Sequence, residues 1–158
     1  MAHRDLKPAN VMLGFDRNYK LIDFGISTTV IGGQRTNSRT LVGTPKFMAP
    51  ELLEGFLLEK TAWEYNPFKS DCFSFGMILL DLVANKTEEI SGLNRNIDSG
   101  VKKKKAILAK VNKFYGRAFK EIIEKMIHSD PNERPSYQDL KMWLKNYKNS
   151  EKFEELTG

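Results

Sequence analysis

The chain has 158 residues, of which 41% are hydrophobic and 28% charged, and its formal net charge is +5. This length is that of one domain with a buried core, and the composition excludes a disordered chain. The longest apolar stretch, residues 73–84, is interrupted by Ser74, Gly76 and Asp81, so it is too short and too polar to cross a bilayer. No apolar leader follows Met1, and no membrane segment is expected.

The single cysteine and the clustered lysines bear on location and partners. Cys72 has no second cysteine with which to form a disulfide in the chain, so a reducing, cytoplasmic environment is expected. It lies in an apolar helical pattern, which favours a small core residue over a reactive thiol. The lysines of residues 102–105 and 141–152 are explained more simply as solvated helix faces than as a nucleic-acid or membrane patch. No nucleic-acid partner is therefore expected.

The first part of the chain predicts a β-hairpin. Two short apolar runs, residues 11–13 and 20–22, flank a segment that contains turn-forming Asp and Asn residues. Such a hairpin would bring Asn10, before its first strand, and Asp23, after its second, to the same end. Residues 26–48 are rich in Ser, Thr and Gly and lack periodicity, so they are expected to be functional or disordered.

The rest of the chain predicts mainly helix. Helical patterns cover residues 51–58, 71–83, 102–114 and 119–127, with a loop over residues 59–69. Ser70 or Asp71 is expected to cap the second of these helices, which is apolar on most faces and should be buried. Ser136 and Asp139 form a near capping box at the start of a last helix. There is no internal repeat and no sign of a second domain.

Four motifs follow one another along the chain. They are His-Arg-Asp-Leu-Lys-Pro-Ala-Asn at residues 3–10, Asp-Phe-Gly at 23–25, Gly-Thr-Pro-Lys-Phe-Met-Ala-Pro-Glu at 43–51 and Asp-Cys-Phe-Ser-Phe-Gly at 71–76. Together they resemble the C-terminal lobe of a eukaryotic-type serine/threonine protein kinase. Phe73 stands where this family usually has Trp, and residues 85–100 lack the family's Gly-x-x-Pro-Phe pattern, which puts substrate docking there in doubt.

The resemblance covers nearly the whole chain and implies a fold. It implies a mainly α, kinase-like C-terminal lobe over residues 1–149, with a small β-hairpin next to the catalytic loop. Residues 23–51 would form the activation segment, and residues 150–158 a polar tail.

The resemblance also implies the chemistry of the site. Asp5 would accept or orient the proton of the substrate hydroxyl, and Lys7 would stabilise charge on the transferring phosphoryl group. Asn10 and Asp23 would hold two Mg²⁺ ions that bridge the phosphates of ATP, because hard oxygen ligands suit that metal. Lysine two residues after the aspartate is the serine/threonine form of the loop, so the expected partner is a protein substrate with a Ser or Thr hydroxyl.

Further residues match supporting positions of the family. Thr44 resembles the threonine that pairs with the catalytic aspartate and lysine, and Met12 the residue that contacts adenine from below. Asp71 resembles the residue that anchors the backbone of the catalytic loop. Glu51 and Arg134 resemble a buried ion pair between the Ala-Pro-Glu motif and the last helices.

Regulation by phosphorylation is also implied. In the family, the residue at Arg4 pairs with a phosphate on the activation segment and so orders that segment. Thr40, four residues before Thr44, is the best-placed acceptor, with Ser38 and Thr36 as the next candidates. The alternative is that these are simple hydroxyls in a flexible loop.

A complete kinase also needs an N-terminal lobe, which these residues do not supply. That lobe carries the glycine-rich loop over the phosphates, a lysine for the phosphates and its partner glutamate. Gly32 and Gly33 are no substitute, because they lie inside the activation segment. We therefore expect a fragment of a longer kinase, a truncated product or a misplaced start, with exposed apolar surface, poor ATP binding and no activity on its own.

Two alternatives come from other functional classes. The first is a non-catalytic kinase-like interaction module or truncated remnant. Such a module would have no need of the intact set Asp5, Lys7, Asn10 and Asp23, so their presence favours descent from an active enzyme. The second is a basic nucleic-acid-binding domain, which rests on the lysine run alone.

Overall fold

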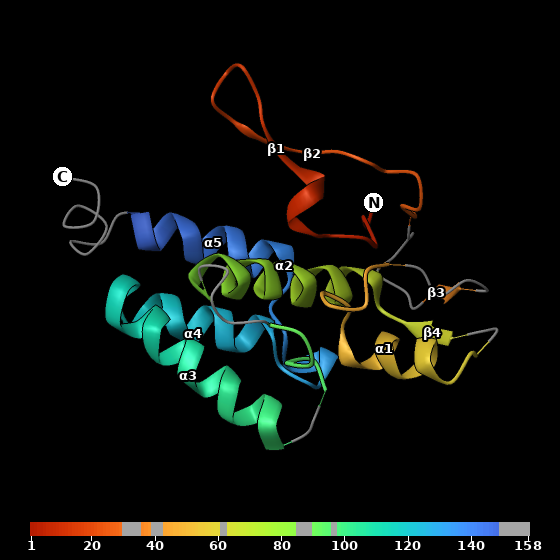
Figure 1. Ribbon diagram of the computed structural model, residues 1–158. Coiled ribbons are helices and arrows are strands. Elements are labelled where there is room, and N and C mark those ends of the chain that lie inside the picture. The colour runs from red at the N-terminus through yellow and green to blue at the C-terminus, as the bar shows by residue number, and fades with distance from the viewer. Residues whose placement is uncertain (30–35, 39–42, 61–62, 85–89, 96–97, 149–158) are drawn as a thin grey trace.

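The computed structural model describes residues 1–29, 36–38, 43–60, 63–84, 90–95 and 98–148. Over these residues the fold is mainly helical, as predicted (Figure 1). The α-helices are α1 (Pro50–Leu57), α2 (Pro67–Ala84), α3 (Asp98–Tyr115), α4 (Arg117–Met126) and α5 (Tyr137–Lys148). Short 3-10 helices are η1 (Pro8–Asn10) and η2 (Pro131–Glu133), and the strands are β1 (Val11–Leu13), β2 (Tyr19–Leu21), β3 (Thr36–Ser38) and β4 (Trp63–Tyr65).

The strands form two antiparallel pairs. Strand β1 pairs with β2, with Met12 opposite Lys20, and this is the predicted hairpin with its second strand one residue earlier than expected. Strand β3 pairs with β4, with Asn37 opposite Glu64. This second pair was not predicted, because its three-residue strands are too short to stand out in the sequence and their pairing joins segments that are distant in sequence.

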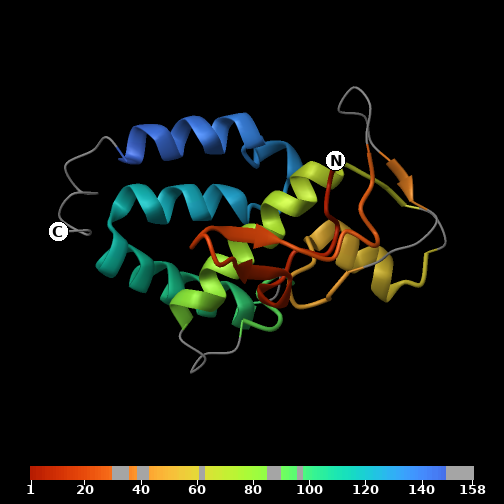
Figure 2. The same cartoon turned by 90° about the horizontal axis from the view of Figure 1, so that it is seen from above.

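Helix α2 is the centre of the core. It packs against α3 and α4, and its Phe73, Met77 and Leu80 are at most 1% exposed. The hairpin β1–β2 lies on the opposite side of α2 from α3 and α4, and it crosses over α2 when seen from above (Figures 1 and 2). The prediction that this helix is buried is confirmed for most of its residues, although Phe75 is 44% and Leu82 67% exposed.

A glycine sets the distance between α2 and the end of α4. A Cβ built on Gly76 would lie 2.6 Å from Cγ2 of Ile127 and 3.0 Å from Cβ of Met126. The first distance is shorter than real Cβ contacts and the second is at their lower limit, so a larger residue would require a shift of α2 or of residues 126–127.

The start of α2 differs from the prediction. Ser70 or Asp71 was expected as the cap, but the helix begins at Pro67, and the Asn66 side chain accepts hydrogen bonds from the backbone N–H groups of Phe68 (3.0 Å) and Lys69 (3.2 Å). Proline fits the first turn of a helix because that turn leaves its N–H groups unpaired anyway. Since capping falls to Asn66, the Asp71 carboxylate is available for a contact elsewhere in the fold.

The predicted capping box at the start of α5 is confirmed. Asp139 accepts a hydrogen bond from the Ser136 backbone N–H (2.8 Å), and the Ser136 hydroxyl oxygen accepts one from the Asp139 N–H (3.2 Å). Two other elements differ at their ends, since α3 starts four residues before the predicted 102 and β4 lies within the predicted loop 59–69. None of the helices in the described part of the chain has the length and apolar character needed to span a bilayer.

A buried arginine, Arg134, joins α1 and α2 to the segment before α5. Both terminal nitrogens of Arg134 bond the Glu51 carboxylate, at 2.8 and 2.7 Å, although the two residues are 83 positions apart. The Arg134 side chain is fully buried, and its Nε donates to the carbonyl of His128 at 2.7 Å. Its guanidinium carbon also lies 4.9 Å from the ring centre of Phe73. This one side chain therefore connects α1, α2 and the turn before α5.

We predict that Arg134→Met destabilises the chain by about 3–5 kcal/mol, because it leaves the Glu51 carboxylate without its partner. Urea denaturation measures this loss. Arg117→Met is the matched control, since Arg117 and its partner Glu121 form an exposed pair that should contribute little. A loss no larger than in the control would contradict the prediction.

Candidate active site

The loop that contains Asp5 is fixed to α2 by one carboxylate. Asp71 accepts hydrogen bonds from the backbone N–H groups of His3 (2.6 Å) and Arg4 (2.9 Å). Burial raises the pKa of Asp71, while these two N–H donors act to lower it. Arg4 has φ 73°, a left-handed conformation that non-glycine residues rarely adopt. The contact with Asp71 therefore holds the backbone directly before Asp5 in an unusual shape.

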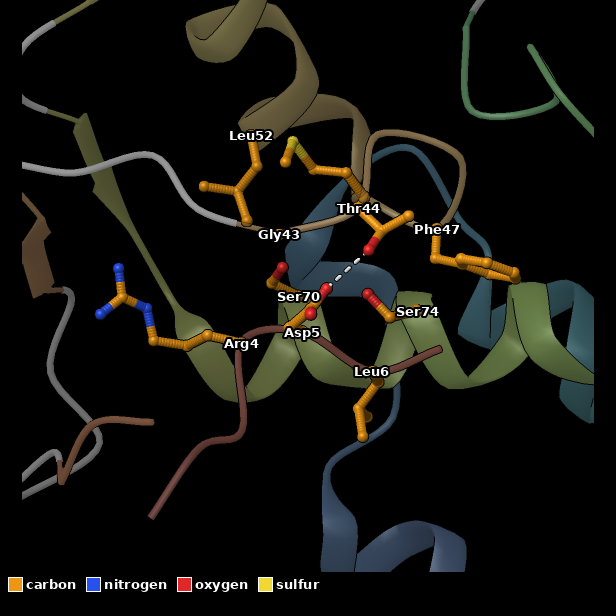
Figure 3. Close-up of a pocket in the computed structure, with 10 residues that line it drawn as sticks. Arg4, Asp5, Leu6, Gly43, Thr44, Phe47, Leu52, Ser70 and Ser74 are labelled. Carbon is orange, nitrogen blue, oxygen red and sulfur yellow. Dashed lines mark hydrogen bonds between the residues drawn. The ribbon is translucent and has the colours of Figure 1, made fainter. Parts of the chain in front are cut away.

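Asp5 is contacted on both carboxylate oxygens. Lys7 Nζ lies 2.6 Å from Oδ2, and the Thr44 hydroxyl donates to Oδ1 at 2.8 Å (Figure 3). Burial acts to raise the pKa of Asp5, but the Lys7 and Thr44 donors outweigh it, so the pKa is lowered from its ordinary value of 3.8. Asp5 is therefore ionised at neutral pH and oriented by two segments that are far apart in sequence.

Glycine is required where these two segments meet. Gly43 has φ 131°, and a Cβ built on it would lie 3.1 Å from the carbonyl oxygen of Arg4. Glycine adopts this conformation without a steric penalty and lets the backbone approach closely. Figure 3 shows Ser70 and Ser74 of α2 on either side of Asp5, and both line the pocket, so α2 forms one wall of the site.

The hairpin brings Asn10 and Asp23 to one end, as predicted. The Asn10 carbonyl accepts a hydrogen bond from the Ile22 N–H (3.0 Å), which closes the hairpin next to both residues. The Asn10 side chain is 4% exposed, and its Nδ2 donates to the Asp5 carbonyl at 2.9 Å. His3 supports the other strand, since its Nε2 lies 2.9 Å from the Ile22 carbonyl and its ring lies 4.9 Å from that of Phe24.

The donor set fits magnesium. Asn10 directs its amide nitrogen to the loop, which leaves the amide oxygen for a ligand, and Asp23 is exposed. An amide oxygen and a carboxylate are hard donors, and Mg²⁺ is usually held by one or two protein ligands together with phosphates and water. No group of three or more acidic, His or Cys side chains that could hold a metal ion gathers within the described residues.

Met12, the residue expected to touch adenine, lies in the middle of β1 and is 53% exposed. It is one of several exposed apolar residues of the hairpin and the segment after it, which agrees with the expectation of exposed apolar surface. The others are Leu13, Phe15, Tyr19, Leu21, Ile22 and Phe24. The contact of Met12 with adenine stays a prediction.

Arg4 contacts a residue that the sequence did not single out. Its Nε donates to the Tyr65 hydroxyl at 2.9 Å, and Tyr65 is 6% exposed in β4. Burial raises the pKa of this phenol, which therefore stays neutral. Tyr65 lies opposite Thr36 of β3, so the strand pair joins β3 to the residue that Arg4 contacts. The sequence offered no signal for Tyr65, which lies in a predicted loop.

The phosphate acceptors are placed only in part. Ser38 and Thr36 lie in β3, which is paired with β4. Thr40 lies outside the described residues.

The predicted buried state of Cys72 is confirmed. It is a free, buried cysteine, and burial raises the pKa of its thiol to about 11. It is therefore an unreactive thiol within the core.

With this geometry in view, comparison with known proteins identifies the family. Residues 1–144 match the family model described as the protein kinase domain, so the chain belongs to the protein kinase family and has the fold of its C-terminal lobe. A probable serine/threonine-protein kinase of Dictyostelium discoideum is 34% identical over 140 residues, which are 87% of this chain and 30% of the relative.

Other relatives are serine/threonine-protein kinase kin-29 of Caenorhabditis elegans, 33% identical over 144 residues, and human rhodopsin kinase GRK1, 31% identical over 142 residues. These matches cover 89% and 88% of the chain, but 16% and 23% of the relatives. The chain thus spans less than a third of the length of each relative.

We predict that Thr44→Val raises the pKa of Asp5, because the variant loses one of the two donors that stabilise the carboxylate. A ¹³C NMR titration of the Asp5 carboxyl measures the shift, and Thr29→Val at an exposed position is the control.

The Asp5–Thr44 contact also affects how the stability of the fold depends on pH. A lowered folded-state pKa stabilises the fold above the unfolded-state value, and this stabilisation is lost as the pH falls through the folded-state pKa. In Thr44→Val the loss on acidification should be smaller. An unchanged Asp5 pKa would contradict the role of the Thr44 hydroxyl.

Proposed function

We propose that this chain is the catalytic lobe of a serine/threonine protein kinase. Within a complete kinase it would transfer the γ-phosphate of ATP to Ser or Thr hydroxyls of a protein substrate. The observation that carries the proposal is the environment of Asp5, whose two oxygens are held by Lys7 and Thr44. Phosphoryl transfer asks for such positioning and charge compensation more than for covalent chemistry by the protein.

The roles of the chain's own residues follow from this geometry. Ionised Asp5 accepts a hydrogen bond, and then the proton, from the substrate hydroxyl, while Lys7 stabilises the charge of the transferring group. Asn10 and Asp23 supply oxygen donors at the end of the hairpin, close to Asp5 through the Asn10 contact. Magnesium bound there with ATP would neutralise the charge of the phosphate oxygens.

We place this activity in a longer protein and in the cytoplasm. The three relatives reported above are longer than this chain, and the 158 residues contain no Gly-x-Gly-x-x-Gly segment to cover the phosphates. The isolated chain should therefore lack kinase activity. A non-catalytic kinase-like module is the alternative, and the complete set Asp5, Lys7, Asn10 and Asp23 favours the enzyme.

We predict that Asp5→Asn lowers kcat by about 10²–10⁴-fold, because the amide cannot accept the hydroxyl proton. The protein for this test is a complete kinase, in which an N-terminal lobe is joined before residue 1. Transfer of radiolabelled phosphate from ATP to Ser- and Thr-containing peptides measures this effect. Asp16→Asn, an exposed substitution in the hairpin turn, is the control. Asp5-dependent phosphate transfer by the isolated 158-residue chain would contradict the prediction that the lobe is inactive alone.

We predict that Thr40→Ala lowers the activity of the complete kinase, because no phosphate could then form at the position best placed to pair with Arg4. Kinase assays on phosphorylated and phosphatase-treated enzyme measure the effect, with Thr29→Ala as the control. Equal activity of Thr40→Ala and the parent enzyme would refute this assignment and turn attention to Ser38.

A further inference from the structure

Asn94 is a buried polar residue that the sequence did not single out. It lies in the segment 90–95 between α2 and α3 and is 4% exposed. Its neighbours Ile90 and Leu93 are 0% and 1% exposed, and Leu93 N–H donates to the Ile90 carbonyl at 3.2 Å. The backbone that carries Asn94 is therefore fixed by the hydrophobic core.

The Asn94 side chain holds one turn of the activation segment. Its Nδ2 donates to the carbonyl of Pro45 at 2.8 Å and to that of Met48 at 2.7 Å. Carbonyls only accept hydrogen bonds, so the amide nitrogen must be the atom that faces them. Both protons of that nitrogen are used, one for each of these two carbonyls.

This turn begins at the residue that contacts Asp5. The Phe47 N–H donates to the Thr44 carbonyl at 2.9 Å, and the Thr44 hydroxyl donates to Asp5. Two further residues hold the turn. Lys46 Nζ lies 3.0 Å from Asp81 of α2, and Phe47, which is 7% exposed, packs into the hydrophobic core. Pro45, whose carbonyl Asn94 binds, directly follows Thr44 in the chain.

We propose that Asn94 is a positioning residue, which binds the carbonyls of Pro45 and Met48 and so places Thr44 against the catalytic Asp5. The assignment of Asp5 and Thr44 to phosphoryl transfer rests on the proposed function, whereas the positioning itself does not. Asn94 lies in the region where the chain lacks the Gly-x-x-Pro-Phe pattern of its family.

The chemistry of this position restricts the side chain. A hydroxyl has one proton and cannot bond both carbonyls, and a carboxylate would repel them. A Leu side chain has nearly the shape of Asn but donates nothing, so it would leave the carbonyls of Pro45 and Met48 without this donor. Asn94→Leu is therefore the substitution that removes the hydrogen bonds without adding a charge.

The first test uses the unmodified 158-residue chain. Both side-chain amide protons of Asn94 should exchange with solvent at least about tenfold more slowly than those of Asn112, which is exposed on α3. NMR measures both rates in one sample. Equal rates for the two side chains would overturn the proposal, and this measurement requires no variant to fold.

The second test separates positioning from a purely structural role. In Asn94→Leu the pKa of Asp5, followed by ¹³C NMR, should rise in the same direction as in Thr44→Val, and in Asn112→Leu it should not change. The double variant Thr44→Val with Asn94→Leu should show no further rise, because both act through one hydrogen bond. A folded Asn94→Leu chain with an unchanged Asp5 pKa would overturn the proposal. Neither test uses enzymatic activity, so failure here is distinct from failure of the proposed function.

Discussion

The Asp71 carboxylate accepts two backbone hydrogen bonds, from His3 and Arg4, and the rest of the site depends on this contact. Arg4 takes a left-handed conformation that costs a non-glycine residue about 1–2 kcal/mol. A hydrogen bond to a charged group contributes about 1.5–3 kcal/mol, so two of them outweigh that cost. The unusual backbone turn is stable for this reason, and it presents Asp5 to the activation segment.

From Asp71 the support extends in two directions. Toward the hairpin, Asn10 binds the Asp5 carbonyl and the Ile22 N–H, so the two expected magnesium ligands share one platform with the catalytic loop. Toward the activation segment, Thr44 meets the other side of Asp5, and Asn94 holds the turn that follows. The site is thus assembled by hydrogen bonds between segments rather than within one element.

Much of the fold and site was predictable because it follows from local patterns. The helix periodicities predicted the helical elements, and the Ser136–Asp139 spacing predicted a capping box that the structure contains. Sequence reasoning failed in two ways. At the start of α2 it missed a local alternative, since Asn66 is the cap in place of Ser70 or Asp71 and Pro67 enters the first turn. It also missed the β3–β4 pairing, which joins two short segments that are distant in sequence. Tyr65 and Asn94 have no local signal at all, because each acts through a contact in another segment.

The sequence by itself determined the family, since the order and spacing of Asp5, Lys7, Asn10 and Asp23 resemble a kinase site before any coordinates are known. Only the tertiary structure decided how these residues are held. Burial and distant donors act together on the pKa of Asp5, and their balance cannot be read from spacing. The same holds for the buried pair of Arg134 and Glu51, whose strength depends on the removal of water by the surrounding core. Residue types are local, whereas burial and contact distance are properties of the folded chain.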